Sequence, residues 1–170
     1  MKVSGLDVHR DSIFCRIYNG KKQEKVQEFS TFTQDIIEMG NMLKKAGVKR
    51  IAMESTGIYW IPIWNILEDM GLELLLVNPY LIKQMPGRKS DVKDAQWIAT
   101  LLHKGLLRGS LIPSKRIREL RTYSRKYVKL QSKVVTVFQE MERILEMCNI
   151  RITSLVSKNN SVSIQKVIKR

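Results

Sequence analysis

The sequence contains few of the residues that build disulfide frameworks or zinc sites. It has two cysteines, Cys15 and Cys148, far apart in the chain, and two histidines. None of them stands at the short spacing typical of metal ligands, so we expect both thiols to be reduced, small and buried. A disulfide-stapled fold and a structural zinc site are therefore excluded.

Long apolar runs are also missing. No segment approaches the roughly 20 apolar residues needed to cross a bilayer, and the first residues lack the apolar stretch of a signal peptide. We therefore expect a cytosolic protein with no membrane partner. Hydrophobic residues nevertheless make up 44% of the 170 residues, which is enough for one packed domain, with or without an appendage.

Acidic residues are scarce relative to basic ones. Thirty Lys and Arg face sixteen Asp and Glu, which gives a net charge of +14. From Lys115 onward there are fourteen basic residues and four acidic ones, so the excess is concentrated in the last third of the chain. This asymmetry favours a nucleic acid as partner over the alternative that the lysines only maintain solubility.

Short runs of β-branched and aromatic residues predict three strands at the start of the chain: Val3–Val8, Ser12–Tyr18 and a segment near 25–30. Helices and strands then alternate. The expected helices cover residues 33–46, with Thr33 as N-cap, 58–70, 79–85, and 90 or 91 to about 104; the expected strands cover 50–53 and 72–77. This order predicts an α/β fold of ribonuclease-H-like (RuvC-like) type, a mixed sheet flanked by helices.

The pattern changes after residue 114. Apolar residues recur in two seven-residue series, and no proline or glycine occurs between residues 115 and 170. The series predict one long coiled-coil helix and, through it, a homodimer or higher oligomer. We expect a metal-binding domain over residues 1–112, a basic helical segment over 113–157 and a divergent polar tail over 158–170. The two series are Leu120, Tyr127, Val134, Met141 and Cys148, and Tyr123, Leu130, Val137 and Ile144.

Four acids stand at the ends of predicted elements. Asp7 lies in the first strand, Glu54 follows the fourth, and Asp91 and Asp94 are three residues apart, on one face of a helix. Carboxylates at neighbouring strand ends repel one another unless a cation lies between them. An all-carboxylate site suits Mg²⁺ or Mn²⁺ rather than Zn²⁺, and such ions support phosphodiester chemistry.

Each acid also has a structural interpretation. Asp7 can form a turn, Glu54 can end a strand or cap the next helix, and Asp91 can be an N-cap. Asp94 can be a first-turn acid favoured by the helix dipole. Their conjunction at the expected elements of one fold favours the metal site.

Basic side chains near the acids and along the long helix are candidate phosphate contacts. Beside the acids they are His9, Arg88 and Lys89, although a structural role for His9 in its loop is an equally good interpretation. On the helix the competing interpretation is a solvated surface. The helix residues are Arg116, Arg118, Arg121, Arg125, Lys126, Lys129 and Lys133.

Four motifs at these positions carry a family resemblance. They are GLDVH at 5–9, MESTGIYW at 53–60, VNP at 77–79 and KSDVKDA at 89–95. In this order and spacing, over about residues 3–155, the chain resembles the N-terminal DEDD domain of insertion-sequence one-ten family transposases, relatives of the Piv invertases.

The resemblance implies a RuvC-like domain that binds Mg²⁺ through Asp7, Glu54, Asp91 and Asp94. It also implies DNA transposition by dimers and tetramers, with a structured bridge RNA as guide. Members of the family continue into a domain that carries a nucleophilic serine, whereas the amino-acid sequence after Ser157 no longer resembles the family. We therefore expect a fragment of such a transposase. The alternatives are a non-catalytic module that binds RNA or DNA and dimerises, and a stand-alone Holliday-junction resolvase.

Overall fold

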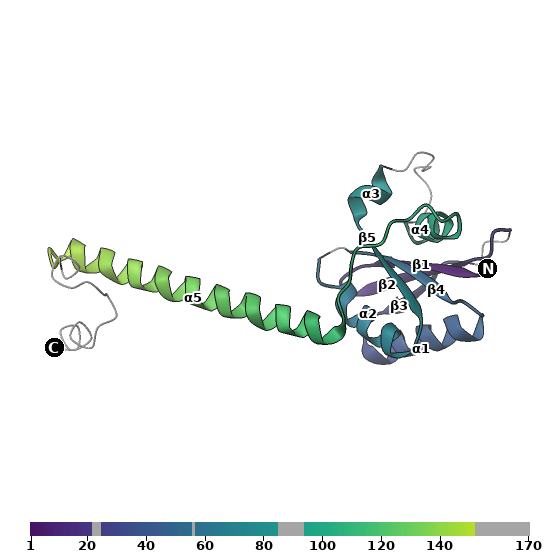
Figure 1. Cartoon of the computed structure of the whole chain (residues 1–170), viewed down its shortest axis with the longest axis horizontal. Helices are drawn as coiled ribbons and strands as arrows, with labels where there is room; N and C mark the ends of the chain where they lie inside the picture. Colours follow the sequence, from purple (N-terminus) through teal and green to yellow (C-terminus); the bar gives the residue numbers. More distant parts are fainter. Residues whose placement is uncertain (22–24, 56, 85–93, 152–170) are drawn as a thin grey trace. The chain divides into compact units, whose positions relative to one another are not determined.

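A computed structural model describes residues 1–21, 25–55, 57–84 and 94–151 of the chain (Figure 1). The chain divides into two compact units, of which the first is Met1–Ile112 and the second starts at Pro113. The predicted Asp91, Arg88 and Lys89 lie outside the described residues.

A five-stranded mixed sheet forms the centre of the first unit, with strand order β3-β2-β1-β4-β5. The first three strands form an antiparallel meander, and the last two run parallel to the first. This topology, with its crossover helices, is that of the ribonuclease-H-like fold, so the predicted fold class is confirmed. The strands are β1 (Val3–Val8), β2 (Ser12–Tyr18), β3 (Gln27–Ser30), β4 (Arg50–Glu54) and β5 (Glu73–Val77).

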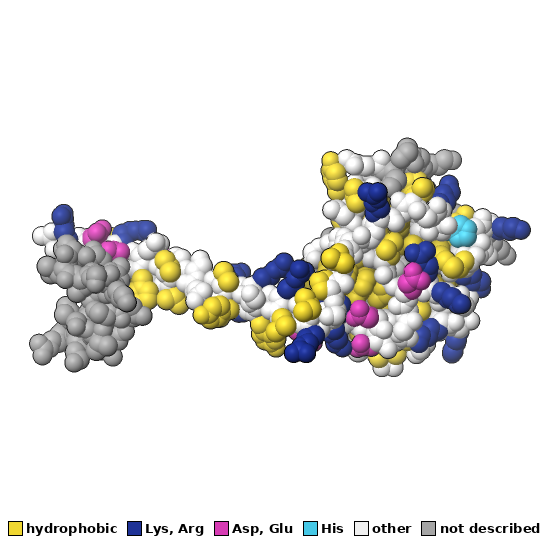
Figure 2. Space-filling view, in the orientation of Figure 1, with side chains coloured by type: hydrophobic (Ala, Val, Ile, Leu, Met, Phe, Trp, Pro, Cys, Tyr) yellow, Lys and Arg dark blue, Asp and Glu magenta, His cyan; other side chains and the backbone are white. Residues whose placement is uncertain are grey.

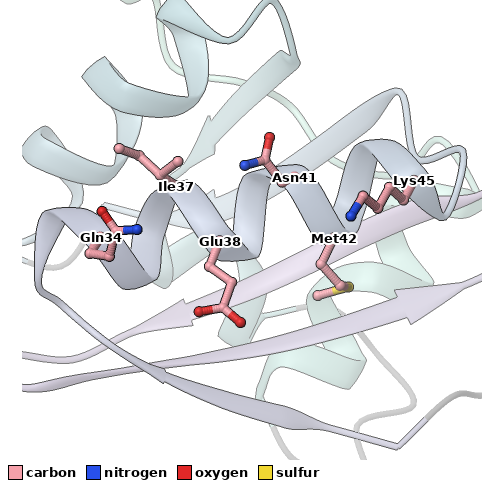
Figure 3. A pocket seen from close by; sticks show the side chains of 6 residues that line it. All are labelled: Gln34, Ile37, Glu38, Asn41, Met42 and Lys45. Atoms are coloured by element: carbon pink, nitrogen blue, oxygen red, sulfur yellow. The ribbon is translucent and has the colours of Figure 1, made fainter.

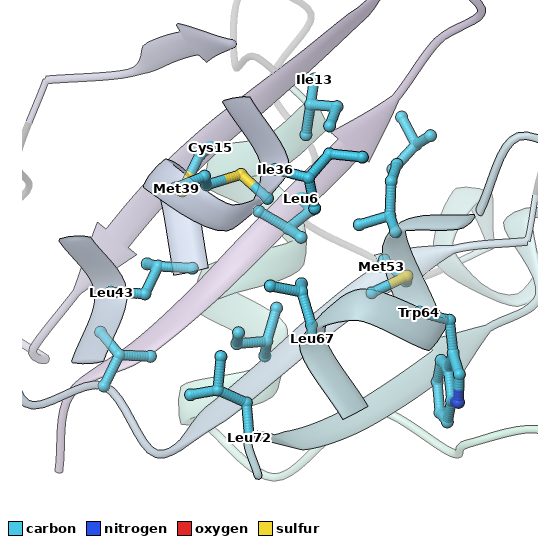
Figure 4. Packing of buried hydrophobic residues seen from close by; sticks show 14 of the residues in the cluster. Leu6, Ile13, Cys15, Ile36, Met39, Leu43, Met53, Trp64, Leu67 and Leu72 are labelled. Carbon is cyan, nitrogen blue, oxygen red and sulfur yellow. The ribbon is translucent and has the colours of Figure 1, made fainter. Parts of the chain in front are cut away.

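Helices cover both faces of this sheet (Figure 1). On one face, α1 (Thr33–Lys45) and α2 (Trp60–Asp69) pack on a large apolar cluster that includes Leu6, Ile13 and Met53 (Figure 4). On the other face, α4 (Asp94–His103) packs on a smaller cluster. A short helix, α3 (Pro79–Lys83), follows β5. Successive residues of a strand point to opposite faces, so a strand residue next to a member of the large cluster faces α4.

Helix α4 approaches the sheet closely at Gly5 of β1. A Cβ atom on this glycine would lie 2.3 Å from the carbonyl oxygen of Ala95 and 2.5 Å from the amide nitrogen of Ala99. Both atoms belong to the α4 backbone and cannot rotate away. Gly5 therefore sets how near α4 lies to β1.

Two details of the sequence-based expectations are wrong. Phe32, not Thr33, occupies the N-cap position of α1 and makes no side-chain capping bond; Thr33 is already the first helical residue. Of the two cysteines expected to be buried, Cys15 lies in the core but Cys148 is exposed. It follows the last turn of a helix that has no buried residue.

That helix, α5 (Lys115–Met147), is the main element of the second unit and is 33 residues long. Within the described ranges, no helix combines the length and the apolar character needed to cross a membrane.

The contact at Gly5 generates a stability prediction. Gly5→Ala should lower the free energy of unfolding by at least about 2 kcal/mol, because the added methyl group collides with helix backbone. Urea-induced unfolding measures this loss. Gly40→Ala is a matched control: its methyl group meets the movable side chains of Met70 and Leu67, and alanine favours the helix, so the change should stay within about 1 kcal/mol. Equal losses in the two variants would contradict the assignment.

Candidate functional site

Two of the predicted acids lie at one edge of the sheet. β1 and β4 are parallel and their register ends with Leu6 beside Met53, so the next residue of each strand, Asp7 and Glu54, reaches the same carboxyl edge. Leu6 and Met53 both belong to the large cluster. Asp7 and Glu54 therefore both face the side of the sheet that α4 covers.

The third described acid, Asp94, begins α4. The next residue, Ala95, lies over Gly5. Gly5 precedes Asp7 by two residues in β1. At its other end, α4 places the His103 ring 5.1 Å from the ring of Tyr18, and Tyr18 pairs with Val3 at the start of β1. The helix thus runs antiparallel to β1, and its first turn lies toward the edge where Asp7 and Glu54 stand.

The Asp7 carboxylate is largely enclosed. Its side chain is 17% exposed, and its Oδ2 atom lies 3.2 Å from Nε2 of His9, whose side chain is 57% exposed. The His9 ring also meets the edge of Phe14 at a centroid distance of 5.7 Å. His9 therefore holds one oxygen of Asp7 in place, whatever further contact the exposed ring makes.

The structure describes three of the four predicted acids, Asp7, Glu54 and Asp94. Among the described residues, no three His, Cys, Asp or Glu side chains are grouped closely enough to hold a metal ion. Asp91 lies outside them, as do Arg88 and Lys89. The four-carboxylate site therefore stays a prediction, which rests on the shared edge of Asp7 and Glu54 and on the position of Asp94 in the first turn of α4.

Two surface hollows lie elsewhere. One follows α1 and is lined by six of its residues, among which Glu38 is the single carboxylate (Figure 3). The other lies where β4 and β5 begin, near Lys49 and Glu73, at the opposite edge from Asp7. Neither hollow contains a predicted acid, so neither offers a rival metal site.

A contact that the sequence analysis missed links β2 to α4. Arg16 stands beside Gly5 in the register, and its Nη1 atom donates a hydrogen bond of 2.8 Å to Oε1 of Gln96. Burial lowers the pKa of the Arg16 guanidinium below its usual value. An arginine facing inward in an alternating strand is the available signal, but its partner lies 80 residues away in sequence.

The predicted basic residues of α5 are at the surface. Six of the seven are exposed, and Arg118 is half-buried, with its Nη1 atom donating to the Pro113 carbonyl at 2.8 Å. Arg121, Arg125, Lys129 and Lys133 are spaced by four, so they line one side of the helix.

Sequence comparison gives the family. A family model described as transposase, that of the insertion-sequence one-ten DEDD group, matches residues 4–150. The chain belongs to this transposase family. The predicted resemblance to this family is thus confirmed. No curated protein is significantly similar to it in sequence.

Solved structures resemble the transposase chain at low identity. RuvC from Thermus thermophilus, in complex with a Holliday junction substrate, is 13% identical with a TM-score of 0.45, and the match covers 65% of this chain and 99% of that one. The Holliday junction resolvase of fowlpox virus is 13% identical with a TM-score of 0.37, covering 53% and 65%. Pelota from Archaeoglobus fulgidus is 12% identical with a TM-score of 0.42, covering 79% and 39%.

Replacing His9 and replacing His103 should change the free energy of unfolding by different amounts. His9→Ala should change the free energy of unfolding by less than about 1 kcal/mol, because its bond to Asp7 is solvent-exposed. His103→Ala should cost more, about 1–2 kcal/mol, because it removes a half-buried ring from Tyr18. Urea unfolding at pH 7 measures both. A larger loss for His9 would mean that the Asp7 contact supports the fold rather than only the site.

Proposed function

We propose that the first unit is the metal-dependent nuclease-like half of the transposase, holding Mg²⁺ or Mn²⁺ through Asp7, Glu54, Asp91 and Asp94. One observation carries the proposal. The parallel pairing of β1 with β4 brings Asp7 and Glu54 to one edge and one face of the sheet, and α4 begins with Asp94 toward that edge. Family membership supports the same assignment.

The donor chemistry fits a hard divalent cation. All four predicted ligands are carboxylates, and oxygen ligands are those that Mg²⁺ and Mn²⁺ prefer. Neighbouring carboxylates facing the same side of a sheet repel one another, and a bound cation relieves this repulsion. Such an ion supplies charge stabilisation to a reacting phosphodiester. His9 fixes one oxygen of Asp7, which orients that carboxylate.

Nucleic acid is the proposed partner of the basic surfaces. Arg88, Lys89 and His9 neighbour the acids in sequence and would contact a phosphate there. The basic residues of α5 would follow the backbone of DNA or of a structured guide RNA. We further propose that the chain self-associates through α5.

The alternative is a module that binds nucleic acid without catalysis, and the exposed basic row of α5 is the observation that favours it. Incubation with supercoiled DNA and Mn²⁺ distinguishes the two. Metal-dependent cleavage that Asp7→Asn abolishes supports the nuclease-like assignment, whereas binding without cleavage supports the module.

Metal binding is tested by two matched variants. Asp7→Asn should weaken Mn²⁺ binding by at least about tenfold, because it removes a direct ligand and one charge. Asp11→Asn makes the same chemical change four residues away, at a side chain that is 89% exposed and pairs with Arg10, and should leave binding unchanged. Isothermal titration calorimetry measures both affinities. In the absence of metal, Asp7→Asn should unfold at a temperature no lower than the wild type, because one source of repulsion is gone.

Two results would remove the metal-site proposal. One is unchanged Mn²⁺ affinity in Asp7→Asn, and the other is an equal loss in both variants, which would indicate a general charge effect.

Nucleic-acid binding is tested along α5. Replacing Arg121, Arg125 and Lys129 by alanine should weaken binding to duplex DNA and reduce the slope of log K against log salt by about two to three, since each phosphate contact contributes about 0.9. Fluorescence anisotropy across a salt series measures the slope. The control replaces three exposed lysines of the first unit, Lys44, Lys45 and Lys49, with the same loss of charge. The same slope in both triple variants would show that net charge, rather than the α5 row, binds DNA.

A further inference from the structure

Helix α5 has an apolar side without a core to bury it. Among the described residues, none in the helix is buried, and Leu120, Tyr127 and Val134 are between 52% and 62% exposed. In Figure 2 hydrophobic side chains form a row along the helix. Water contact along such a row is unfavourable, so this surface is suited to a partner.

The charges of α5 are arranged against its own dipole. From Lys115 to Lys133 there are eight basic residues and one acid, whereas Val134 to Met147 holds three glutamates and one arginine. A helix alone is stabilised by acids at its start and bases at its end, as in α1, which has Asp35 in its first turn and Lys44 and Lys45 in its last. α5 has neither feature. Its charge pattern therefore favours an external partner with the opposite order of charges.

We propose that this partner is α5 of a second copy of the chain, packed antiparallel, so that each basic half lies beside the acidic half of the other. The inference rests on the self-association proposed above and adds the orientation, the register and the pairing residues.

One register buries the whole apolar row. In this register each residue of one helix faces the residue of the second helix whose number brings the sum to 264, so that Leu120 faces Ile144 of the second copy. Every heptad layer from Leu120 to Ile144 is then apolar on both sides. The layers are Leu120 with Ile144, Tyr123 with Met141, Tyr127 with Val137, and Leu130 with Val134, each formed twice. Each tyrosine then packs against an unbranched or smaller side chain. The Tyr127 hydroxyl keeps its bond of 2.9 Å from Gln131.

A parallel dimer of the same helix is less favourable. It would stack Tyr123 on Tyr123 and Tyr127 on Tyr127 and align the two basic halves side by side. Like charges at such a distance repel. The antiparallel register instead brings Lys126 near Glu140 of the second copy, twice per dimer. Lys133 lies near the two-fold axis and is therefore close to Lys133 of the second copy.

Cysteine cross-linking in the full chain tests the orientation. In a Cys148→Ser background, Leu120→Cys and Ile144→Cys are prepared separately and oxidised alone and mixed. The antiparallel register brings position 120 within disulfide reach of position 144 of the other copy. The mixture should therefore give a cross-linked heterodimer, and each variant alone should stay monomeric on a non-reducing gel. Ser132→Cys, on the opposite side of the helix, is the control that should not cross-link.

The alternatives give different bands. Homodimers of each variant alone would establish a parallel pair and overturn the proposal. Absence of any cross-link, or a monomer in sedimentation equilibrium, would overturn it as well.

A charge exchange tests the pairing independently. Lys126→Glu should raise the dimer dissociation constant by about tenfold, because two attractive contacts become repulsive. The double variant Lys126→Glu with Glu140→Lys should restore the wild-type value. Arg125→Glu makes the same reversal away from the seam and should have a smaller effect. A double variant weaker than either single one would overturn the proposed pairing.

The outcome is independent of the metal site. Mn²⁺ affinity measured on the same cross-linking variants reports on Asp7 and its neighbours alone. Intact Mn²⁺ binding without the antiparallel cross-link would contradict the dimer proposal alone. The antiparallel cross-link without Mn²⁺ binding would contradict the metal-site proposal alone.

Discussion

The close contact between α4 and β1 at Gly5 is the constraint on which the candidate site depends. With a side chain at this position, backbone atoms of Ala95 and Ala99 would have to move outward. Asp94 stands immediately before Ala95 and would move with them. The separation between Asp94 and the strand-end acids is thus set by an absent methyl group. Arg16 strengthens the same contact from β2 by its bond to Gln96.

This arrangement explains how a sheet tolerates acids at its edge. Asp7 lies between Leu6 and Val8, whose side chains are both buried in the large cluster, so the strand keeps the Asp7 side chain on the face that α4 covers. An enclosed carboxylate is costly unless it is compensated. In the structure His9 contacts one oxygen of Asp7, and in the proposed function a cation would compensate the carboxylates together. The same packing that makes the acids costly holds them in position.

Much of this unit could be predicted from sequence, because its strands are short, β-branched and separated by turn residues. The limits of β1 and β2 agree with the prediction to the residue. The contact of Arg16 with Gln96 could not be predicted, since spacing tells which side a residue faces but not what lies opposite. The prediction of Thr33 as the N-cap of α1 was wrong because Phe32 occupies the N-cap position, although its side chain makes no capping hydrogen bond. The burial expected for Cys148 was wrong because this residue follows the last turn of α5, a helix that has no buried residue.

Under the two proposals made for α5, one helix would serve two partners. The heptad row and the basic row of Arg121, Arg125 and Lys129 occupy different sides of α5, so covering the first leaves the second open to a phosphate backbone. In the antiparallel register the two copies of Lys115 lie about 50 Å apart, at 1.5 Å per residue. Under these proposals, a duplex that spans this distance would be about 15 base pairs long at 3.4 Å each.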